Sequence, residues 1–437
     1  HGLEILRFKT GTPSRVDRRS LHMDKMELEE GDPENHAFSF MSERKDRNKR
    51  NCWLTYTNEK THEIIRENIM RAPKYAGKIH GIGARYCPSI EDKVVRFADK
   101  DRHQLFVEPE GLDTTEMYVQ GMSTSMPIDV QYAFLRTIPG FEDVKMMRPA
   151  YAIEYDLLDP LQLYPTLEVI KLPGLYSAGQ SNGTSGYEEA AAQGLVAGIN
   201  AALKIQGKDP FILARHEAYI GSLVDDLVTK GADEPYRMMT SRSEYRLILR
   251  QDNADLRLTE KGHSIGLVGE ERYARFLERK KKYEEAMDYI RTQRFTPKEE
   301  INRALESMGT APLTTGTGAD QILKRPEMTY RKMMEMLGCP AFDEEAVEEM
   351  EITVKYEGYI ARQEAAVRKA ARMENEKLPL DMDYLSLDGI STEARQKMDK
   401  IRPLSLGQAA RIPGVSPADI SVLMVYVKQR KGKKGAE

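Results

Sequence analysis

Hydrophobic and polar residues follow different periods in the two parts of this chain. Up to about residue 203, short apolar runs favour strands, for example over residues 1–12, 104–108 and 117–120. Beyond residue 203, strand patterns nearly vanish, and long charged amphipathic stretches predict helices over residues 270–293 and 344–374. The pattern therefore predicts an α/β portion followed by an all-helical portion.

Residues 174–202 carry the most distinctive pattern. An apolar run that ends at Tyr176 predicts a buried strand, and a glycine-rich turn and a helix follow it. Glycine lets a backbone approach a ligand closely, and a helix N-terminus can direct its N–H groups at a phosphate or a flavin carbonyl. The helix repeats small residues along one face, at Ala190, Gly194, Ala197, Gly198 and Ala201. We expect this face to lie against a sheet or a dinucleotide cofactor, most simply a flavin, and spacing alone leaves both readings open.

Composition limits the class of protein. The 437 residues suggest about three domains, and 65 basic against 69 acidic side chains leave a net charge of −4, which suits a cytoplasmic protein with mixed surfaces. No apolar run is long enough to span a bilayer, and no signal peptide opens the sequence, so no membrane association is expected. The three cysteines are far apart and form no CxxC pair, so no metal site or disulfide framework is predicted. We expect Cys52 and Cys339 to be packing residues.

The third cysteine, Cys87, lies in a different setting. Ser89, followed three residues later by Asp92, predicts a helix start with capping-box spacing just after Cys87. The helix dipole and the nearby Arg85 and Lys93 would favour the thiolate, which a nucleophile requires. A small buried hydrophobe, the commonest fate of a free cysteine, fits the same residues.

A second candidate site lies in residues 234–250. The segment contains four arginines, Arg237, Arg242, Arg246 and Arg250. The last three recur every four residues, so on a helix they would share one face. Arginines interleaved with tyrosines can bind phosphates and stack on unpaired RNA bases. Salt bridges to neighbouring acids such as Glu244 and Asp252 are the alternative.

Two further segments are weaker signals. A strand leading into the turn after Phe8 could direct Lys9, with the backbone of Thr10 and Gly11, at a phosphate or a flavin edge, but it lacks the Walker spacing. Near the C-terminus, residues 404–420 resemble two short helices joined by a hairpin turn. That unit can pack on its own bundle or dock a partner.

Together these segments resemble the MnmG (GidA) family of tRNA uridine-5-carboxymethylaminomethyl modification enzymes, and the resemblance runs along the whole chain. The distinctive segments, in order, are FKTGTPSR, TNEKTH, GARYCPSIEDKVVRFADK, RPAYAIEYD, GLYSAGQSNGTSGYEEAAAQGLVAGINAA, EPYRMMTSRSEYRLILRQDNADLRLT and KYEGYIARQ. The resemblance implies a homodimer that binds FAD in a glutathione-reductase-like fold, oxidises NADH and works with the GTPase MnmE. It also implies modification of C5 of the wobble uridine, position 34, in tRNA. The carbon would come from methylenetetrahydrofolate and the amine from glycine or ammonium.

The resemblance also implies roles for individual residues. Cys87 matches the family's essential cysteine. The region assigned to NAD matches Gly83, Ala84, Arg85, Tyr86, Pro88, Ser89, Glu91, Asp92 and Lys93. The flavin contacts match Gly179, Gln180, Asn182, Gly183, Thr184 and Gly186, to which we add Lys9, Thr10 and Gly11. The tRNA contacts match Arg237 and Arg246, with Arg242 and Arg250 beside them.

The resemblance gives an expected domain organisation. Residues 1–12 and 85–203 would be the remainder of an FAD-binding domain, residues 13–84 an inserted α+β domain on the NAD and substrate side, residues 204–355 a helical tRNA-binding region, and residues 356–437 a C-terminal helical subdomain that docks MnmE. The family's GxGxxG segment has no counterpart here, because Gly81-Ile-Gly83 lacks a third glycine, and a second family cysteine is also absent. We therefore expect a chain without the family's N-terminal part, which by itself holds FAD poorly and is inactive. A non-catalytic RNA-binding or partner-docking fragment, and a flavin oxidoreductase acting on a small molecule, are the alternatives.

Overall fold

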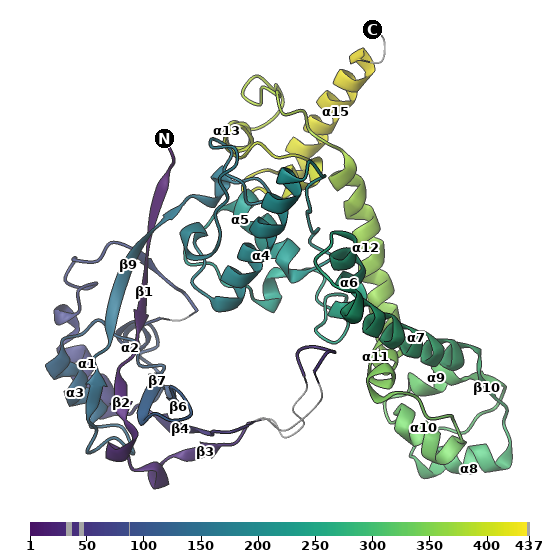
Figure 1. Ribbon diagram of the computed structural model, residues 1–437, viewed down its shortest axis with the longest axis horizontal. Helices are drawn as coiled ribbons and strands as arrows, with labels where there is room; N and C mark the ends of the chain where they lie inside the picture. Colours follow the sequence, from purple (N-terminus) through teal and green to yellow (C-terminus); the bar gives the residue numbers. More distant parts are fainter. Residues whose placement is uncertain (32–36, 43–47, 87, 435–437) are drawn as a thin grey trace. The chain divides into compact units, whose positions relative to one another are not determined.

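The computed structural model describes residues 1–31, 37–42, 48–86 and 88–434, and they form two compact units (Figure 1). Unit 1 comprises His1–Ala37, Glu43–Ile212 and Leu223–Met238. Unit 2 comprises Phe38–Ser42, Leu213–Ser222 and Met239–Glu437. Unit 1 contains both larger sheets, whereas unit 2 is helical apart from two strands of two residues, β10 (Arg294–Phe295) and β11 (Thr317–Gly318). The predicted succession of an α/β portion and a helical portion is confirmed.

Two sheets organise unit 1. One is three-stranded with the order β5-β1-β9, and the other is six-stranded with the order β3-β4-β6-β7-β2-β8. The strands of the first are β1 (Ile5–Thr12), β5 (Ile82–Gly83) and β9 (Tyr151–Leu158). The strands of the second are β2 (Arg15–Asp17), β3 (Glu27–Glu29), β4 (Cys52–Tyr56), β6 (Gln104–Pro109), β7 (Glu116–Gln120) and β8 (Met146–Arg148).

The chain passes between the two sheets at two prolines. It leaves β1 for β2 through Pro13, and it returns from β8 to β9 through Pro149. Proline has no N–H group to donate to a ladder, so each proline interrupts strand pairing where the chain changes sheets. Strand pairing therefore groups residues on both sides of the boundary expected between residues 84 and 85. The strands of the six-stranded sheet lie between β2 and β8 in sequence, and β5 between them pairs with β1 in the other sheet.

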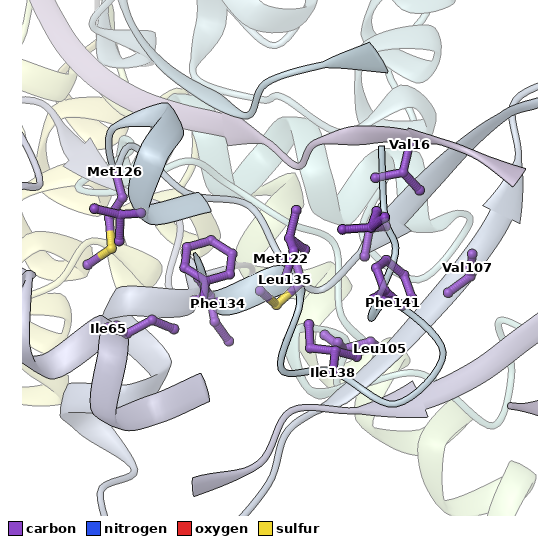
Figure 2. Close-up of a cluster of buried hydrophobic side chains, with 14 of the residues drawn as sticks. Val16, Ile65, Leu105, Val107, Met122, Met126, Phe134, Leu135, Ile138 and Phe141 are labelled. Atoms are coloured by element: carbon purple, nitrogen blue, oxygen red, sulfur yellow. The ribbon is translucent and has the colours of Figure 1, made fainter. Parts of the chain in front are cut away.

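The core of the inserted portion lies between the six-stranded sheet and three helices, α1 (Glu59–Glu67), α2 (Ile90–Arg96) and α3 (Ile128–Leu135). Figure 2 shows Val16, Leu105 and Val107 of the strands beside Phe134 and Leu135 of α3. Each of these side chains is fully buried. Helix α1 begins with a capping box, in which Asn58 accepts from the backbone N–H of Thr61.

The other helices of unit 1 are α4 (Tyr187–Ile205) and most of α5 (Tyr219–Lys230). The strand predicted to precede the glycine-rich turn is not formed. Residues 163–176 make only isolated bridges, Leu163 with Val169 and Glu168 with Tyr176, because the chain reverses at Gly174, whose φ is 91°. Short 3-10 helices complete the chain at Arg18–Ser20, Met23–Lys25, Ile69–Arg71, Pro160–Gln162, Gly179–Asn182 and Thr240–Arg242.

The helices of unit 2 surround two separate cores. The first core lies among α7 (Glu270–Thr292), α8 (Glu299–Ser307), α9 (Ala319–Leu323), α10 (Tyr330–Leu337) and α11 (Glu344–Lys355), and it includes Cys339, as predicted. The second lies among α13 (Thr392–Ile401), α14 (Leu406–Arg411) and α15 (Pro417–Lys434). The remaining helices are α6 (Ala254–Ser264) and α12 (Glu357–Asn375). The prediction of a single helix over residues 344–374 is wrong, because the helix is interrupted at Tyr356.

In the described part of the chain, no helix is both long and apolar enough to cross a lipid bilayer.

Candidate functional site

The glycine-rich turn of unit 1 runs through a 3-10 helix, η5 (Gly179–Asn182), into α4. Gly179 and Gly183 adopt left-handed backbone conformations, with φ of 77° and 87°. A side chain at Gly183 would press on Leu157, Ala232 and Phe8, so this position needs glycine for space as well as for conformation. The turn is therefore tightly packed on the three-stranded sheet.

Gln193 of α4, which the sequence analysis missed, holds this turn. Its amide is fully buried and accepts from the Gly179 N–H at 3.1 Å and from Asn182 Nδ2 at 3.0 Å. It also donates to Thr184 Oγ1 at 2.6 Å. The available signal was an amide side chain in a helix rich in small residues, because a buried amide must find partners.

The predicted flavin residues separate into an internal and an exposed set. The Thr184 hydroxyl makes its hydrogen bonds inside the turn, since it donates to Gly179 O at 2.9 Å and accepts from Gln193. Gln180 is exposed. Asn182 is buried, yet its Oδ1 has no hydrogen-bond partner in the described structure. An orphaned buried acceptor is uncommon and fits a turn that is completed by a bound donor.

The last glycine of the turn, Gly186, immediately precedes α4. Its φ is −79°, so its conformation does not require glycine. A side chain there would collide with Glu189 Oε2 and Arg237 Nη1. Glu189 is buried, accepts from the Met238 N–H at 2.8 Å, and lies 3.7 Å from Arg237 Nε. Gly186 therefore makes room for an ion pair at the start of α4, and Arg237, predicted to contact tRNA, lies beside the flavin turn.

Part of the small-residue face of α4 is exposed in the described structure. Gly194 and Gly198 are exposed, and a Cβ added at either would meet nothing within 4 Å in the described structure. The buried side chains of α4 lie on the neighbouring face, at Glu189, Gln193, Val196, Ala197, Asn200 and Leu203. Buried polar groups thus orient this helix as much as its small residues do.

Lys9 of β1 faces away from the glycine-rich turn. Phe8, its neighbour, contacts the position of Gly183, and successive residues of a strand point to opposite faces. Lys9 pairs with Gly83 in the sheet, is buried, and contributes its charge to the surroundings of Asp92. The structure therefore brings Lys9 to the segment expected to bind NAD. Gly11, at the end of the strand, is exposed.

Part of the segment expected to bind NAD is buried and makes hydrogen bonds within unit 1. Asp92 accepts from Lys74 Nζ at 2.6 Å and from Tyr75 OH at 3.1 Å. Burial acts to raise the pKa of Asp92, but Lys74 outweighs it, so the pKa lies below its usual value. Glu91 is also buried and accepts from the Ser125 N–H and hydroxyl. Lys93 donates to Gly121 O.

The rest of this segment faces outward. Arg85 and Tyr86 are exposed, and Arg85 Nε lies 3.1 Å from Glu234, three residues before Arg237. Ser89 begins α2 as predicted, but it makes no capping hydrogen bond, so the predicted capping box is wrong. Its buried hydroxyl has no partner in the described structure. Cys87 lies outside the described residues.

The shared helical face predicted for Arg242, Arg246 and Arg250 is not formed. Arg242 ends a three-residue 3-10 helix, and only turns follow up to residue 250. Arg215 holds the segment in this shape, because it donates to Arg242 O at 3.1 Å and pairs with Glu244 at 2.8 Å.

Arg250 is committed to ion pairs inside unit 2. It contacts Asp252 at 3.0 Å and the buried Glu349 of α11 at 2.5 Å. For this arginine the salt-bridge alternative is confirmed. Arg246, in contrast, is exposed.

Comparison with known proteins gives one consistent result. Family models match residues 1–209 (glucose inhibited division protein A), 270–364 (tRNA modifying enzyme MnmG/GidA C-terminal helical domain) and 366–437 (MnmG/GidA C-terminal helical bundle). A tRNA uridine 5-carboxymethylaminomethyl modification enzyme MnmG of Caldicellulosiruptor saccharolyticus is 56% identical over 99% of this chain and 70% of its own length. The corresponding protein of Clostridium kluyveri is 56% identical over 99% of this chain and 69% of its own length.

A solved structure supports the same assignment. Aquifex aeolicus GidA superimposes with a TM-score of 0.86 at 45% identity, over 98% of this chain and 68% of that protein. The match joins the α/β unit and the helical unit in a single relative. The chain belongs to the MnmG (GidA) family.

Proposed function

We propose that this protein takes part in modifying C5 of the wobble uridine, position 34, of tRNA, adding an aminomethyl or carboxymethylaminomethyl group. The observation that supports this most directly is the similarity along nearly the whole chain to proteins named as tRNA uridine-modifying enzymes. The proposal includes FAD and NADH as cofactors and methylenetetrahydrofolate as the carbon donor. It also includes glycine or ammonium as the amine donor, the GTPase MnmE as partner, a homodimer and a cytoplasmic location.

The residues of the glycine-rich turn fit a flavin. Gln180 is exposed, and Asn182 Oδ1 is a buried acceptor without a partner in the described structure. FAD would supply the transfer of reducing equivalents from NADH. In this proposal Gln193 keeps the turn rigid, and the Glu189–Arg237 pair fixes the start of α4.

The outward-facing half of residues 83–93 fits the NAD side of the same unit. Arg85 supplies an exposed positive charge for a phosphate, and Tyr86 an exposed ring on which a base can stack. Asp92 and Glu91 anchor α2 from behind and are not expected to touch the cofactor. Lys9 and Lys74 hold the charge of Asp92 in place.

Cys87 is the proposed catalytic residue. Its thiolate would add to C6 of the uracil ring and so make C5 nucleophilic, or it would act there as general acid or base. The purified full-length product of the gene that contains this sequence, supplied with tRNA, FAD, NADH, the carbon and amine donors and the partner GTPase, tests this role. We expect Cys87→Ser to abolish modified uridine, measured by nucleoside mass spectrometry. Cys52→Ser, at a half-buried position in β4, should retain it. Normal modification by Cys87→Ser would exclude the catalytic role.

The two alternative functions predict different results. A small-molecule flavin oxidoreductase would oxidise NADH without tRNA dependence, and its tRNA affinity would not change on replacing Arg237 and Arg246 by alanine. A non-catalytic docking or RNA-binding module would bind tRNA without any flavin absorbance in the purified protein.

A further inference from the structure

Helix α12 of unit 2 presents an unusual surface. It is 19 residues long, yet none of its side chains is buried in the described structure. The interruption of the helix at Tyr356 separates it from α11. Ile360 and Val367 are partly buried and Met373 packs against the second core of unit 2, so this helix has partly covered positions as well as an exposed surface.

Two exposed tyrosines stand at the start of this helix. Tyr356 and Tyr359 are 47% and 57% exposed, and their ring centroids lie 6.4 Å apart with a tilt of 51°. The guanidinium of Arg362 lies 5.7 Å from the Tyr359 ring centroid, in cation–π range. Residues three apart lie next to each other on a helical surface, which places these two rings side by side. Exposed rings with an adjacent arginine are the side chains on which unpaired nucleic-acid bases stack.

A row of free positive charges continues from these tyrosines. Arg362, Lys369 and Arg372 follow spacings of seven and three, which place them on one helical face. Ten residues of helix carry this row over roughly 15 Å. All three are exposed, and none forms an ion pair with a carboxylate of the described structure. Between them lie Ala365 and Ala366, which leave the helix surface open to close approach.

The acidic residues of α12 do not neutralise this row. Glu357 pairs with Lys324 at 2.6 Å, and Glu364 lies 3.8 Å from Arg368. Glu374, at the far end, pairs with Arg411 of α14. The exposed face of α12 is therefore positively charged along its length, although the helix as a whole contains both signs.

We propose that Tyr356, Tyr359, Arg362, Lys369 and Arg372, which we call the α12 platform, bind a single-stranded segment of RNA. At least one unpaired base stacks on the tyrosines, and neighbouring phosphates lie along the cations. This inference rests on the proposed function in taking the RNA to be tRNA, whose loops supply unpaired bases. It gives unit 2 an RNA contact that does not depend on Arg250, whose charge is held by Asp252 and Glu349.

Fluorescence anisotropy of the purified protein tests the platform. The probes are a tRNA, a labelled RNA hairpin with an unpaired loop, and a fully paired RNA duplex of the same length. We expect Tyr359→Ala to weaken hairpin binding about tenfold, the loss typical of one stacked base. Tyr359→Phe should bind as the unaltered protein does, because it keeps the ring. The duplex should bind more weakly than the hairpin and respond little to Tyr359→Ala.

The three cations have a separate signature. Replacing Arg362, Lys369 and Arg372 together by glutamine should reduce the slope of log affinity against log salt by about 2, since each phosphate contact on a single strand contributes about 0.7. A matched control replaces Lys281, Arg303 and Arg331, exposed cations on other helices of unit 2. The control should leave the slope nearly unchanged. Because α12 buries none of these side chains, all variants should keep their helical circular dichroism.

Three outcomes would overturn the inference. The first is that hairpin affinity is unchanged in Tyr359→Ala and in the triple variant. The second is that the control triple loses as much RNA affinity as the platform triple. The third is that the platform variants bind RNA normally but lose binding to a protein partner. The proposed function fails separately. If hairpin binding depends on Tyr359 but the unaltered protein never modifies uridine, the platform stands and the proposed function falls. If uridine is modified normally and the platform variants bind normally, only the platform falls.

Discussion

Replacing Gln193 by leucine tests whether one buried amide holds the glycine-rich turn. The side chains have similar volume, so packing changes little while the polar partners are lost. The variant leaves the Gly179 N–H without its partner, removes one of two bonds of Asn182 Nδ2, and removes the donor to Thr184. An unpaired buried donor costs about 1–3 kcal/mol and each further hydrogen bond about 1 kcal/mol, so we expect a loss of about 3 kcal/mol.

Hydrogen exchange read by mass spectrometry reports this loss where it occurs. The amide of Gly179 should exchange about a hundredfold faster in Gln193→Leu, because about 1.4 kcal/mol corresponds to a factor of ten. Amides of the six-stranded sheet, which Gln193 does not contact, should keep their rates. Gln206→Leu, at the exposed end of the same helix, is the matched control and should change stability by less than about 0.5 kcal/mol. Unchanged exchange at Gly179 would show that the turn is held by other contacts.

Three further predictions concern charged groups. Burial lowers the pKa of His62 and of His103, so below about pH 6.5 the unfolded chain binds more protons than the folded chain. The urea midpoint of unit 1 should therefore decrease as the pH is lowered below about 6.5. Replacing both histidines by glutamine should flatten this pH dependence, and an unaltered dependence would contradict the assignment. Burial and the neighbouring Asp252 raise the pKa of Glu349 to about 8, so unit 2 should lose stability as the pH rises from about 4.5 to 8. Glu349→Gln should remove this loss of stability, which thermal melts across that pH range would measure. Above about pH 8, where Glu349 is charged, Arg250→Gln leaves this buried carboxylate without its ion-pair partner and should destabilise unit 2 by about 3 kcal/mol in urea, whereas the exposed Arg246→Gln should not; equal effects would refute the buried role of Arg250.

Local patterns predicted the elements well. The strand at residues 1–12, the helix after the glycine turn and the long helix near residue 270 all follow from periodicity within one segment. The pairing of β4 with β6 could not be predicted, because no local sequence feature identifies the partner of either strand. The expected domain boundaries stay a prediction, while Pro13 and Pro149 lie where the chain passes between the two sheets.

The site was predicted in composition and only partly in arrangement. Glycines that need positive φ were found from sequence, but Gly186 is explained by an ion pair that joins Glu189 to Arg237, 48 residues apart in the chain. The four-residue spacing of Arg242, Arg246 and Arg250 suggested a helix. Tertiary contacts from Arg215 override that local preference. The α12 platform was missed because the sequence does not show that Tyr356 and Tyr359 stay exposed, although their spacing of three makes them neighbours on a helix.

The wobble uridine itself gives the most direct test of the central claim. The gene that encodes this sequence would be expressed in a bacterium that lacks its own member of the family, and its tRNA nucleosides would be analysed by mass spectrometry. The account predicts that an aminomethyl or carboxymethylaminomethyl group appears at C5 of uridine 34 and is absent with Cys87→Ser. Unmodified uridine 34 with the unaltered gene, despite stable expression and FAD bound to the purified protein, would contradict it.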